Sequence, residues 1–176
     1  IVTWYKNGNF GGTLQAFSLA KVFASFGMEV EFVNYRPDEG LKRKIKNAMI
    51  YCFCPCVMKS RWKIWDFVKM NLRETPQLND YEALSDYARK NFDFVVCGSD
   101  QIWASFKDKL LPEVNFLTFV PSHFRVAYAP SIGLNKIPER HKSLFAKFVS
   151  DFTFLSVREK KGAELIRSLT GLECQV

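Results

Sequence analysis

Two kinds of hydrophobic spacing alternate along the chain. Short runs rich in β-branched and aromatic residues predict strands at residues 1–5, 30–35, 92–97, 125–129 and 152–157. Between them, apolar residues that recur every three or four positions predict helices at residues 13–26, 81–91, 138–149 and 158–169. Strands that alternate with helices in this way favour a doubly wound, mostly parallel α/β sheet with helices on both faces.

The pattern is less regular at three places. Residues 41–72 predict a mostly helical insertion that is broken at Pro55, because proline cannot donate a hydrogen bond inside a helix. We expect the second half of this insertion to bury one side, formed by Trp62, Trp65, Phe67 and Val68. Asn79 and Glu82 have the spacing of a capping box before the helix at 81–91. The apolar run at 116–120 predicts a short edge strand.

Length and composition are those of one globular domain. The chain has 176 residues, of which 48% are apolar and 15% aromatic, and this excludes a disordered or low-complexity protein. Ala48–Met58, the longest apolar stretch, is 11 residues long. A membrane-spanning helix needs about 20.

The net charge of +7 is concentrated in one segment. Leu41–Arg73 holds nine basic residues and one acidic residue, while the rest of the chain is nearly neutral. This basic segment is either a solvated helix face or a surface that attracts anionic lipid, nucleic acid or an acidic substrate. We expect no nucleic-acid partner, because the chain has no helix-turn-helix, zinc-finger or RNA-recognition signature.

Three of the five cysteines lie in the same segment, at Cys52, Cys54 and Cys56. One-residue gaps do not fit a structural zinc site, whose paired ligands are usually two to four residues apart, and we expect no metal. Palmitoylation of a basic helix remains an alternative, and small buried hydrophobic side chains are the favoured interpretation.

Five short motifs follow predicted strands in order along the chain. They are Asn9-Phe10-Gly11-Gly12-Thr13-Leu14-Gln15-Ala16-Phe17-Ser18-Leu19, Val33-Asn34-Tyr35-Arg36, Gly98-Ser99-Asp100-Gln101-Ile102-Trp103, Ala127-Tyr128-Ala129-Pro130-Ser131-Ile132-Gly133 and Ser156-Val157-Arg158-Glu159. In this order they resemble the polysaccharide pyruvyl transferase family over nearly the whole chain. The basic segment matches no motif of the family.

The resemblance implies one half of a two-domain enzyme of the glycosyltransferase type B arrangement. Residues 1–176 would form a single Rossmann-like N-terminal domain, with the insertion at about 41–73, and a C-terminal domain is expected beyond Val176. Members of the family transfer the pyruvyl group of phosphoenolpyruvate to sugar hydroxyls and form a pyruvate ketal on bacterial cell-surface polysaccharide. The implied partners are therefore phosphoenolpyruvate, as co-substrate rather than cofactor, and a sugar or lipid-linked oligosaccharide acceptor.

Candidate site residues come from the motifs, because ligands of open α/β sheets bind beyond the carboxyl ends of the strands. Asn9, Gly11, Gly12 and Gln15 lie at a glycine-rich turn into a helix, where free N–H groups favour an anion. The alternative is that the glycines serve only a tight turn and that Asn9 braces the loop.

The later motifs supply the candidates with more reactive chemistry. Asp100 could accept a proton from an acceptor hydroxyl, or it could cap the next turn together with Ser99. Arg158 could bind a carboxylate or phosphate with both arms of its guanidinium, or it could pair with Glu159. Gln101 and Ser131 complete the predicted substrate-binding set.

The proton donor and most phosphate ligands are expected from the C-terminal domain, so this chain alone is expected to be inactive. We expect a cytoplasmic protein that contacts the inner face of the membrane through Leu41–Arg73. Two other functions remain open. One is a nucleotide-binding Rossmann domain of another enzyme, although the first turn lacks the G-x-G-x-x-G spacing. The other is a non-catalytic interaction module that works at a membrane surface.

Overall fold

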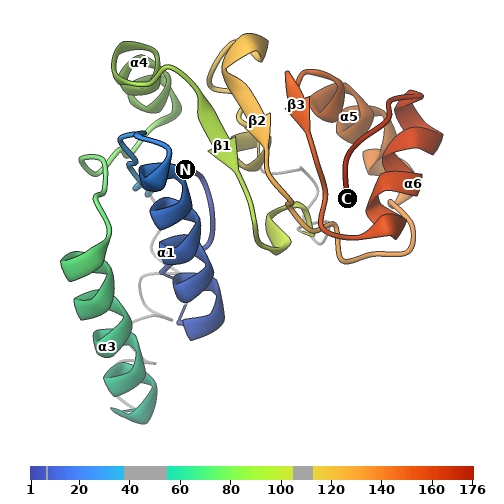
Figure 1. Ribbon diagram of the computed structural model, residues 1–176. Coiled ribbons are helices and arrows are strands. Elements are labelled where there is room, and N and C mark those ends of the chain that lie inside the picture. Colours follow the sequence, from blue (N-terminus) through green and yellow to red (C-terminus); the bar gives the residue numbers. More distant parts are fainter. Residues whose placement is uncertain (7, 38–54, 105–112) are drawn as a thin grey trace. The chain divides into compact units, whose positions relative to one another are not determined.

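A computed structural model describes residues 1–6, 8–37, 55–104 and 113–176 (Figure 1). These residues form two compact units. The sheet unit consists of Ile1–Thr3 and Ser85–Val176, and the helical unit consists of Trp4–Leu84. Each unit is described by itself below.

The sheet unit is built on three parallel strands. They are β1 (Val95–Cys97), β2 (Arg125–Ala127) and β3 (Phe154–Leu155), and they lie in the order β1-β2-β3 (Figure 1). Single parallel bridges extend this sheet at both edges, between Val2 and Cys97 and between Ser156 and Gln175. All three residues of β1 are buried, as expected for a strand that is covered on both faces.

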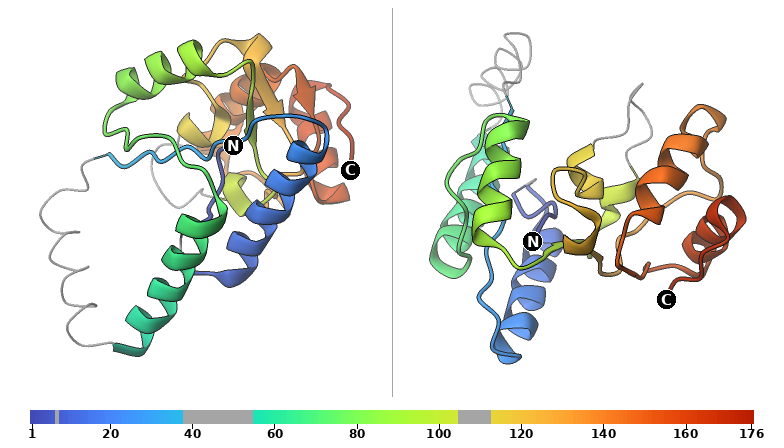
Figure 2. Two further views of the ribbon diagram at one scale, coloured as in Figure 1. Left: turned by 60° about the vertical axis from the view of Figure 1, so that its left-hand side comes forward. Right: turned by 90° about the horizontal axis from the view of Figure 1, so that it is seen from above.

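Two helices of the sheet unit pack side by side, α5 (Glu139–Ser150) and α6 (Lys160–Thr170) (Figure 2). An aromatic cluster joins α5 to two short 3-10 helices, η1 (Gln101–Trp103) and η2 (Glu113–Phe116). The rings of Trp103 and Phe116 stack at 5.4 Å, and Phe145 of α5 contacts both rings edge-on. These buried rings supply much of the apolar area that holds the unit together.

In the helical unit, α1 (Phe10–Ser25) packs against α3 (Pro55–Asn71), and Phe17 meets Phe67 at 5.4 Å between ring centroids. α3 is described from Pro55, the first residue after the undescribed range 38–54. The predicted strand at 30–35 makes isolated parallel bridges from Phe32 to Glu74 and from Tyr35 to Leu78. α4 (Tyr81–Asn91) then carries the chain into the sheet unit.

Two helix starts and one helix cap differ from the predictions, and one of these differences is that α6 begins at Lys160 rather than Arg158. α1 begins at Phe10 rather than Thr13, because the side chain of Asn9 accepts a hydrogen bond from the N–H of Gly11 at 2.9 Å and caps the helix. The cap before α4 is Asp80 rather than Asn79, since Asp80 accepts from the N–H of Ala83 at 2.7 Å. The bounds predicted for α4 itself are confirmed.

Two further predictions are wrong. The run at 116–120 forms no strand, because η2 and a turn bury Phe116, Leu117, Phe119 and Val120 in the core instead. In α3, Val68 is buried as predicted, but Trp62 is 60% exposed and Trp65 39% exposed. Ile64 takes a buried position on that helix, and Leu72, which directly follows the helix, is also buried.

The described residues therefore form a mixed α/β structure with five α-helices and one three-stranded parallel sheet. This structure is consistent with the expected Rossmann-like fold, although the sheet is smaller than the sequence predicts. None of the helices in the described ranges is both long enough and apolar enough to cross a bilayer.

Candidate functional site

The motifs that follow β1, β2 and β3 meet beyond the carboxyl ends of these strands. The N–H of Ser131 donates to the carbonyl of Asp100 at 2.8 Å, and the N–H of Arg158 donates to the carbonyl of Pro130 at 3.3 Å. Three segments that are distant in sequence are thereby joined by backbone hydrogen bonds. We call Asp100, Ser131, Arg158 and Glu159 the strand-end cluster.

The segments that follow β1 and β2 approach each other so closely that the residue after β1 must be glycine. Gly98 has a φ of +106°, and a Cβ atom at this position would lie 2.2 Å from the carbonyl oxygen of Tyr128 and 3.0 Å from the nitrogen of Pro130. No side chain fits such a distance, and L-residues rarely adopt that φ. Gly98 is therefore needed for the first motif to lie against the second.

Glu159 links the second and third motifs through its carboxylate. Its Oε1 accepts a hydrogen bond from the hydroxyl of Ser131 and lies 3.6 Å from Nε of Arg158. Its Oε2 is buried and has no hydrogen-bond partner in the described structure. Glu159 also precedes the first residue of α6, where the positive end of the helix dipole stabilises an anion.

Arg158 is exposed, and Nε of its guanidinium lies 3.6 Å from Oε1 of Glu159. The ion pair considered from the sequence is thus present. It occupies one side of the guanidinium, and the geometry of a planar fork leaves the two terminal nitrogens able to donate to a carboxylate or phosphate. The arrangement can hold one anionic group at the edge of the sheet.

Asp100 and Ser131 have structural roles in the same cluster. Oδ1 of Asp100 accepts from the N–H of Gln101 at 2.7 Å, which is the capping role considered from the sequence. The side chain of Ser131 is fully buried and donates to Glu159. Ser99 is half-buried and Gln101 exposed. Direct contact of these four residues with a substrate remains a prediction.

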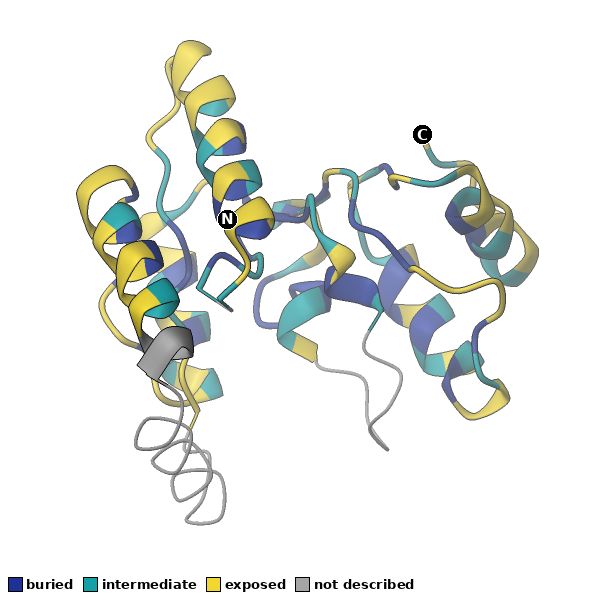
Figure 3. Cartoon of the chain, turned by 90° about the horizontal axis from the view of Figure 1, so that it is seen from below, coloured by how far each residue is buried: buried dark blue, intermediate teal, exposed yellow. Residues whose placement is uncertain are grey.

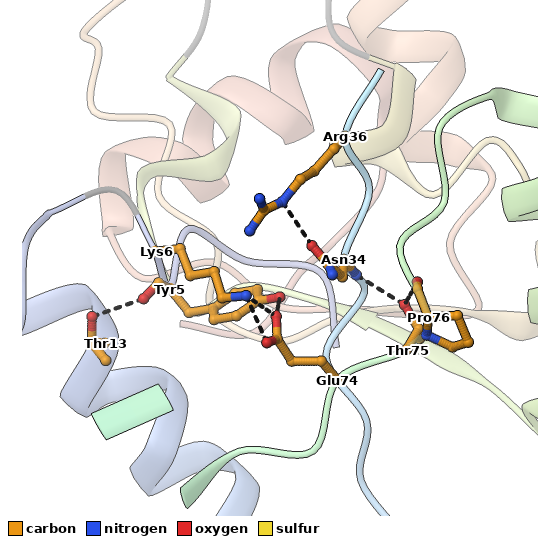
Figure 4. Close-up of polar contacts among 8 residues, drawn as sticks. All are labelled: Tyr5, Lys6, Thr13, Asn34, Arg36, Glu74, Thr75 and Pro76. Carbon is orange, nitrogen blue, oxygen red and sulfur yellow. Dashed lines mark hydrogen bonds and ion pairs between the residues drawn. The ribbon is translucent and has the colours of Figure 1, made fainter. Parts of the chain in front are cut away.

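The glycine-rich turn of the first motif belongs to the helical unit. Asn9 caps α1, as the alternative interpretation of this loop supposes, and Gly11 and Gly12 form its first turn. The hydroxyl of Thr13 donates to the carbonyl of Tyr5 at 2.8 Å and fixes the start of α1 to the end of the first extended segment (Figure 4). Gln15 is half-buried on the next turn.

A second polar cluster lies in the helical unit, around Glu74 (Figure 4). The phenol of Tyr5 donates to Oε1 of Glu74, and Nζ of Lys6 donates to Oε2 at 2.6 Å. Burial, the hydrogen bond to Glu74 and the negative charge of Glu74 raise the pKa of Tyr5, and the positive charge of Arg36 opposes this rise. Tyr5 therefore stays protonated and acts as a hydrogen-bond donor.

Arg36 extends from the second motif towards the same cluster (Figure 4). Its Nε donates to Oδ1 of Asn34 at 3.0 Å, and the N–H of Asn34 donates to the hydroxyl of Thr75 at 3.0 Å. No sequence signal marks Lys6 or Glu74, because neither lies within one of the five motifs. A signal was present only for Arg36, which ends the second motif.

No group of three metal-ligating side chains gathers in the described parts of the chain. Cys52 and Cys54 lie outside the described residues, as does the side chain of Cys56, so the cysteine predictions stay untested. Cys97 is a free cysteine within β1, and burial raises the pKa of its thiol. It is a small core residue rather than a reactive one.

The parallel sheet defines an α/β protein whose strand-end cluster lies at the edge where such folds bind their ligands. A family model described as polysaccharide pyruvyl transferase matches residues 9–174, and the chain belongs to this family. The resemblance drawn from the five motifs is thereby confirmed. Membership indicates a transferase that acts on polysaccharide. No curated protein and no solved structure matched the chain.

Proposed function

We propose that the chain is the N-terminal, Rossmann-like half of an enzyme that transfers the pyruvyl group of phosphoenolpyruvate to two hydroxyls of a sugar. Family membership and the Arg158 site are the support for this reaction. A second domain completes a glycosyltransferase type B cleft. The acceptor is a sugar or lipid-linked oligosaccharide in the cytoplasm.

The reaction places three chemical demands on the site. A proton adds to the methylene carbon of phosphoenolpyruvate, which becomes a methyl group. Two hydroxyl oxygens bond to the neighbouring carbon and lose their protons, and the bond from that carbon to the phosphate oxygen breaks. Phosphate leaves with the electron pair of that bond and with one of the two hydroxyl protons, and the other hydroxyl proton replaces the one given to the methylene carbon. The site must therefore hold anionic groups, accept a proton and supply a proton.

Arg158 meets the need to hold an anionic group, because its guanidinium is a cation beside Glu159. Its Nε is held by Glu159, which is itself held by Ser131, so the guanidinium loses little freedom when an anion binds. In this proposal its outer nitrogens bind the carboxylate or the phosphate of phosphoenolpyruvate. The contact between Arg158 and Glu159 is the single observation that carries the assignment.

Asp100 is the proposed acceptor of the hydroxyl proton. One carboxylate oxygen is used in the cap of η1, and the other is left for a sugar hydroxyl. Ser99 and Gln101 are proposed to contact the acceptor beside Asp100. Asn9, Gly11, Gly12 and Gln15 of the helical unit also stay proposed substrate contacts. The acid that protonates the methylene carbon and the remaining phosphate ligands come from the second domain, so the chain alone is inactive.

The test is Arg158→Ala in the intact protein that contains this chain, assayed as phosphate released from phosphoenolpyruvate in the presence of an oligosaccharide acceptor. Turnover should fall by about 10²–10³-fold, as for the loss of one preorganised donor. Arg158→Lys should recover little, because a lysine offers no planar fork.

Arg167→Ala is the matched control. Arg167 is an exposed arginine of α6, and its Nε pairs with Glu173 at 3.1 Å. Neither Arg167 nor Glu173 belongs to the strand-end cluster. It should keep full turnover, and both variants should melt like the parent protein. Undiminished turnover in Arg158→Ala would remove Arg158 from the site.

A further inference from the structure

The two sides of α3 differ in what they contact. Ile64, Val68 and Leu72 recur every four residues and are buried, and Phe67 packs on Phe17 of α1. The opposite side carries large apolar residues in contact with solvent, since Trp62 is 60% exposed and Met70 76% exposed. Figure 3 shows this division along α3, the helix whose first turn is grey.

Basic residues share the exposed side with these apolar ones. Lys59, Lys63 and Lys69 are all exposed. Lys59 lies three residues before Trp62, Lys63 directly follows Trp62, and Lys69 directly precedes Met70. From Pro55 to Asn71 the helix has four basic residues and one acidic residue, Asp66. We call Lys59, Trp62, Lys63, Lys69 and Met70 the outer face of α3.

We propose that the outer face of α3 docks on an anionic lipid bilayer. Tryptophan is favoured at the boundary between headgroups and acyl chains, because its ring is apolar and its N–H remains in a polar layer. Lysine stems lie along apolar surface while their ammonium groups reach the lipid phosphates. A helix that exposes both kinds of side chain on one side lies in the plane of the interface.

Charge complementarity selects this occupant. A neutral protein surface would bury Trp62 and Met70 but leave three ammonium groups without partners, which costs free energy. An anionic bilayer both buries the apolar side chains and gives the ammonium groups negatively charged partners. The proposal goes beyond pyruvyl transfer and does not depend on it, because no residue of the strand-end cluster takes part.

The experiment is co-flotation of the chain with phosphatidylcholine vesicles, with and without phosphatidylglycerol. We expect binding only to the vesicles that contain phosphatidylglycerol, and weaker binding as salt is raised. Replacing Lys59, Lys63 and Lys69 by Gln should weaken binding about a hundredfold, at about fivefold for each lysine near the surface. Trp62→Ala with Met70→Ala should also reduce binding.

A charge-matched control separates the face from the net charge. Replacing Lys136, Lys147 and Lys160 by Gln removes the same charge from exposed positions of the sheet unit and should leave binding unchanged. An equal loss in this control would overturn the proposal, as would equal flotation with neutral vesicles or none with anionic ones.

Tryptophan fluorescence gives a second readout of the same surface. Emission should shift to the blue when phosphatidylglycerol vesicles are added, and the shift should disappear in Trp62→Phe with Trp65→Phe but persist in Trp4→Phe. Emission from Trp62 that is already blue-shifted without vesicles would show that protein covers the face, and would refute lipid docking.

Discussion

Replacing Gly98 by alanine tests the packing on which the strand-end cluster depends. Gly98 follows β1, and the Cβ of an alanine there would lie 2.2 Å from the carbonyl oxygen of Tyr128 and 3.1 Å from its carbonyl carbon. These are backbone atoms of the motif that follows β2, so they cannot turn aside as a flexible side chain would. One of the two segments must move away from the other.

The cost has two parts that add. A positive φ in an L-residue costs about 1–2 kcal/mol. Forcing an extra carbon into a packed interior costs about 1–3 kcal/mol more. We therefore expect Gly98→Ala to lower the free energy of unfolding by about 2–5 kcal/mol, a large part of the roughly 5–15 kcal/mol that a domain of this size has.

Gly171→Ala separates the two parts. Gly171 ends α6 with a φ of +74°, and a Cβ at this position would meet nothing within 4 Å. This variant therefore has the backbone strain without the collision and should cost only about 1–2 kcal/mol. Its difference from Gly98→Ala measures how closely the segments after β1 and β2 approach each other.

The assay is urea unfolding followed by the fluorescence of Trp103, which is buried in the sheet unit, in a background where the other three tryptophans are phenylalanine. The midpoint for Gly98→Ala should fall by at least about 0.7 M urea, which is the smallest expected cost divided by the largest typical dependence of about 3 kcal/mol per molar. If both variants shift the midpoint equally, the close approach is wrong, and so is the geometry of the cluster built on it.

Two further predictions concern buried groups of the sheet unit. Arg125→Met should destabilise the sheet unit by about 2–4 kcal/mol in urea unfolding. The buried guanidinium of Arg125 donates to the carbonyl of Val120 at 2.8 Å and to Asp151 at 3.1 Å, and its loss would leave both acceptors without this donor. A loss of stability below about 1 kcal/mol would contradict this reasoning. For Cys97, burial raises the pKa of the thiol in the folded state, so the folded protein keeps a proton that the unfolded chain releases above about pH 8.5. This contribution is fully present below that pH, and above it the free energy of unfolding should fall by up to about 1.4 kcal/mol per pH unit. Cys97→Ala should flatten the slope between neutral and alkaline pH, and an unchanged slope would refute the role of the thiol.

Regular elements with strong periodicity could be predicted from the sequence, and elements decided by tertiary pairing could not. α4 has the predicted bounds, and Gly171 ends α6 in the left-handed conformation that the sequence implies. The segment at 30–35 instead makes only isolated bridges, with partners at Glu74 and Leu78 that no hydrophobic pattern marks. The size and apolar character of Trp62 and Trp65 predict that they are buried, but the spacing along α3 gives the buried positions to Ile64 and Val68.

The candidate site shows the same division. The motifs identified Asp100, Ser131 and Arg158 because polar residues directly after buried strands are placed at one edge of a parallel sheet. Their partners depend on the distances between strand ends, and a sequence does not contain those distances. Lys6 and Glu74 are 68 positions apart, and only the fold brings them into contact.

Glu159 shows why such partners matter to the chemistry. Arg158 precedes α6, and a cation near the start of a helix is disfavoured by the helix dipole. Glu159 offsets this unfavourable position of Arg158. Its carboxylate is stabilised at the same helix start and lies between Ser131 and Nε of Arg158. The buried Oε2 without a partner adds a cost that a purely structural ion pair would not need. In the function proposed above, this acid would hold the arginine in place for an anionic ligand.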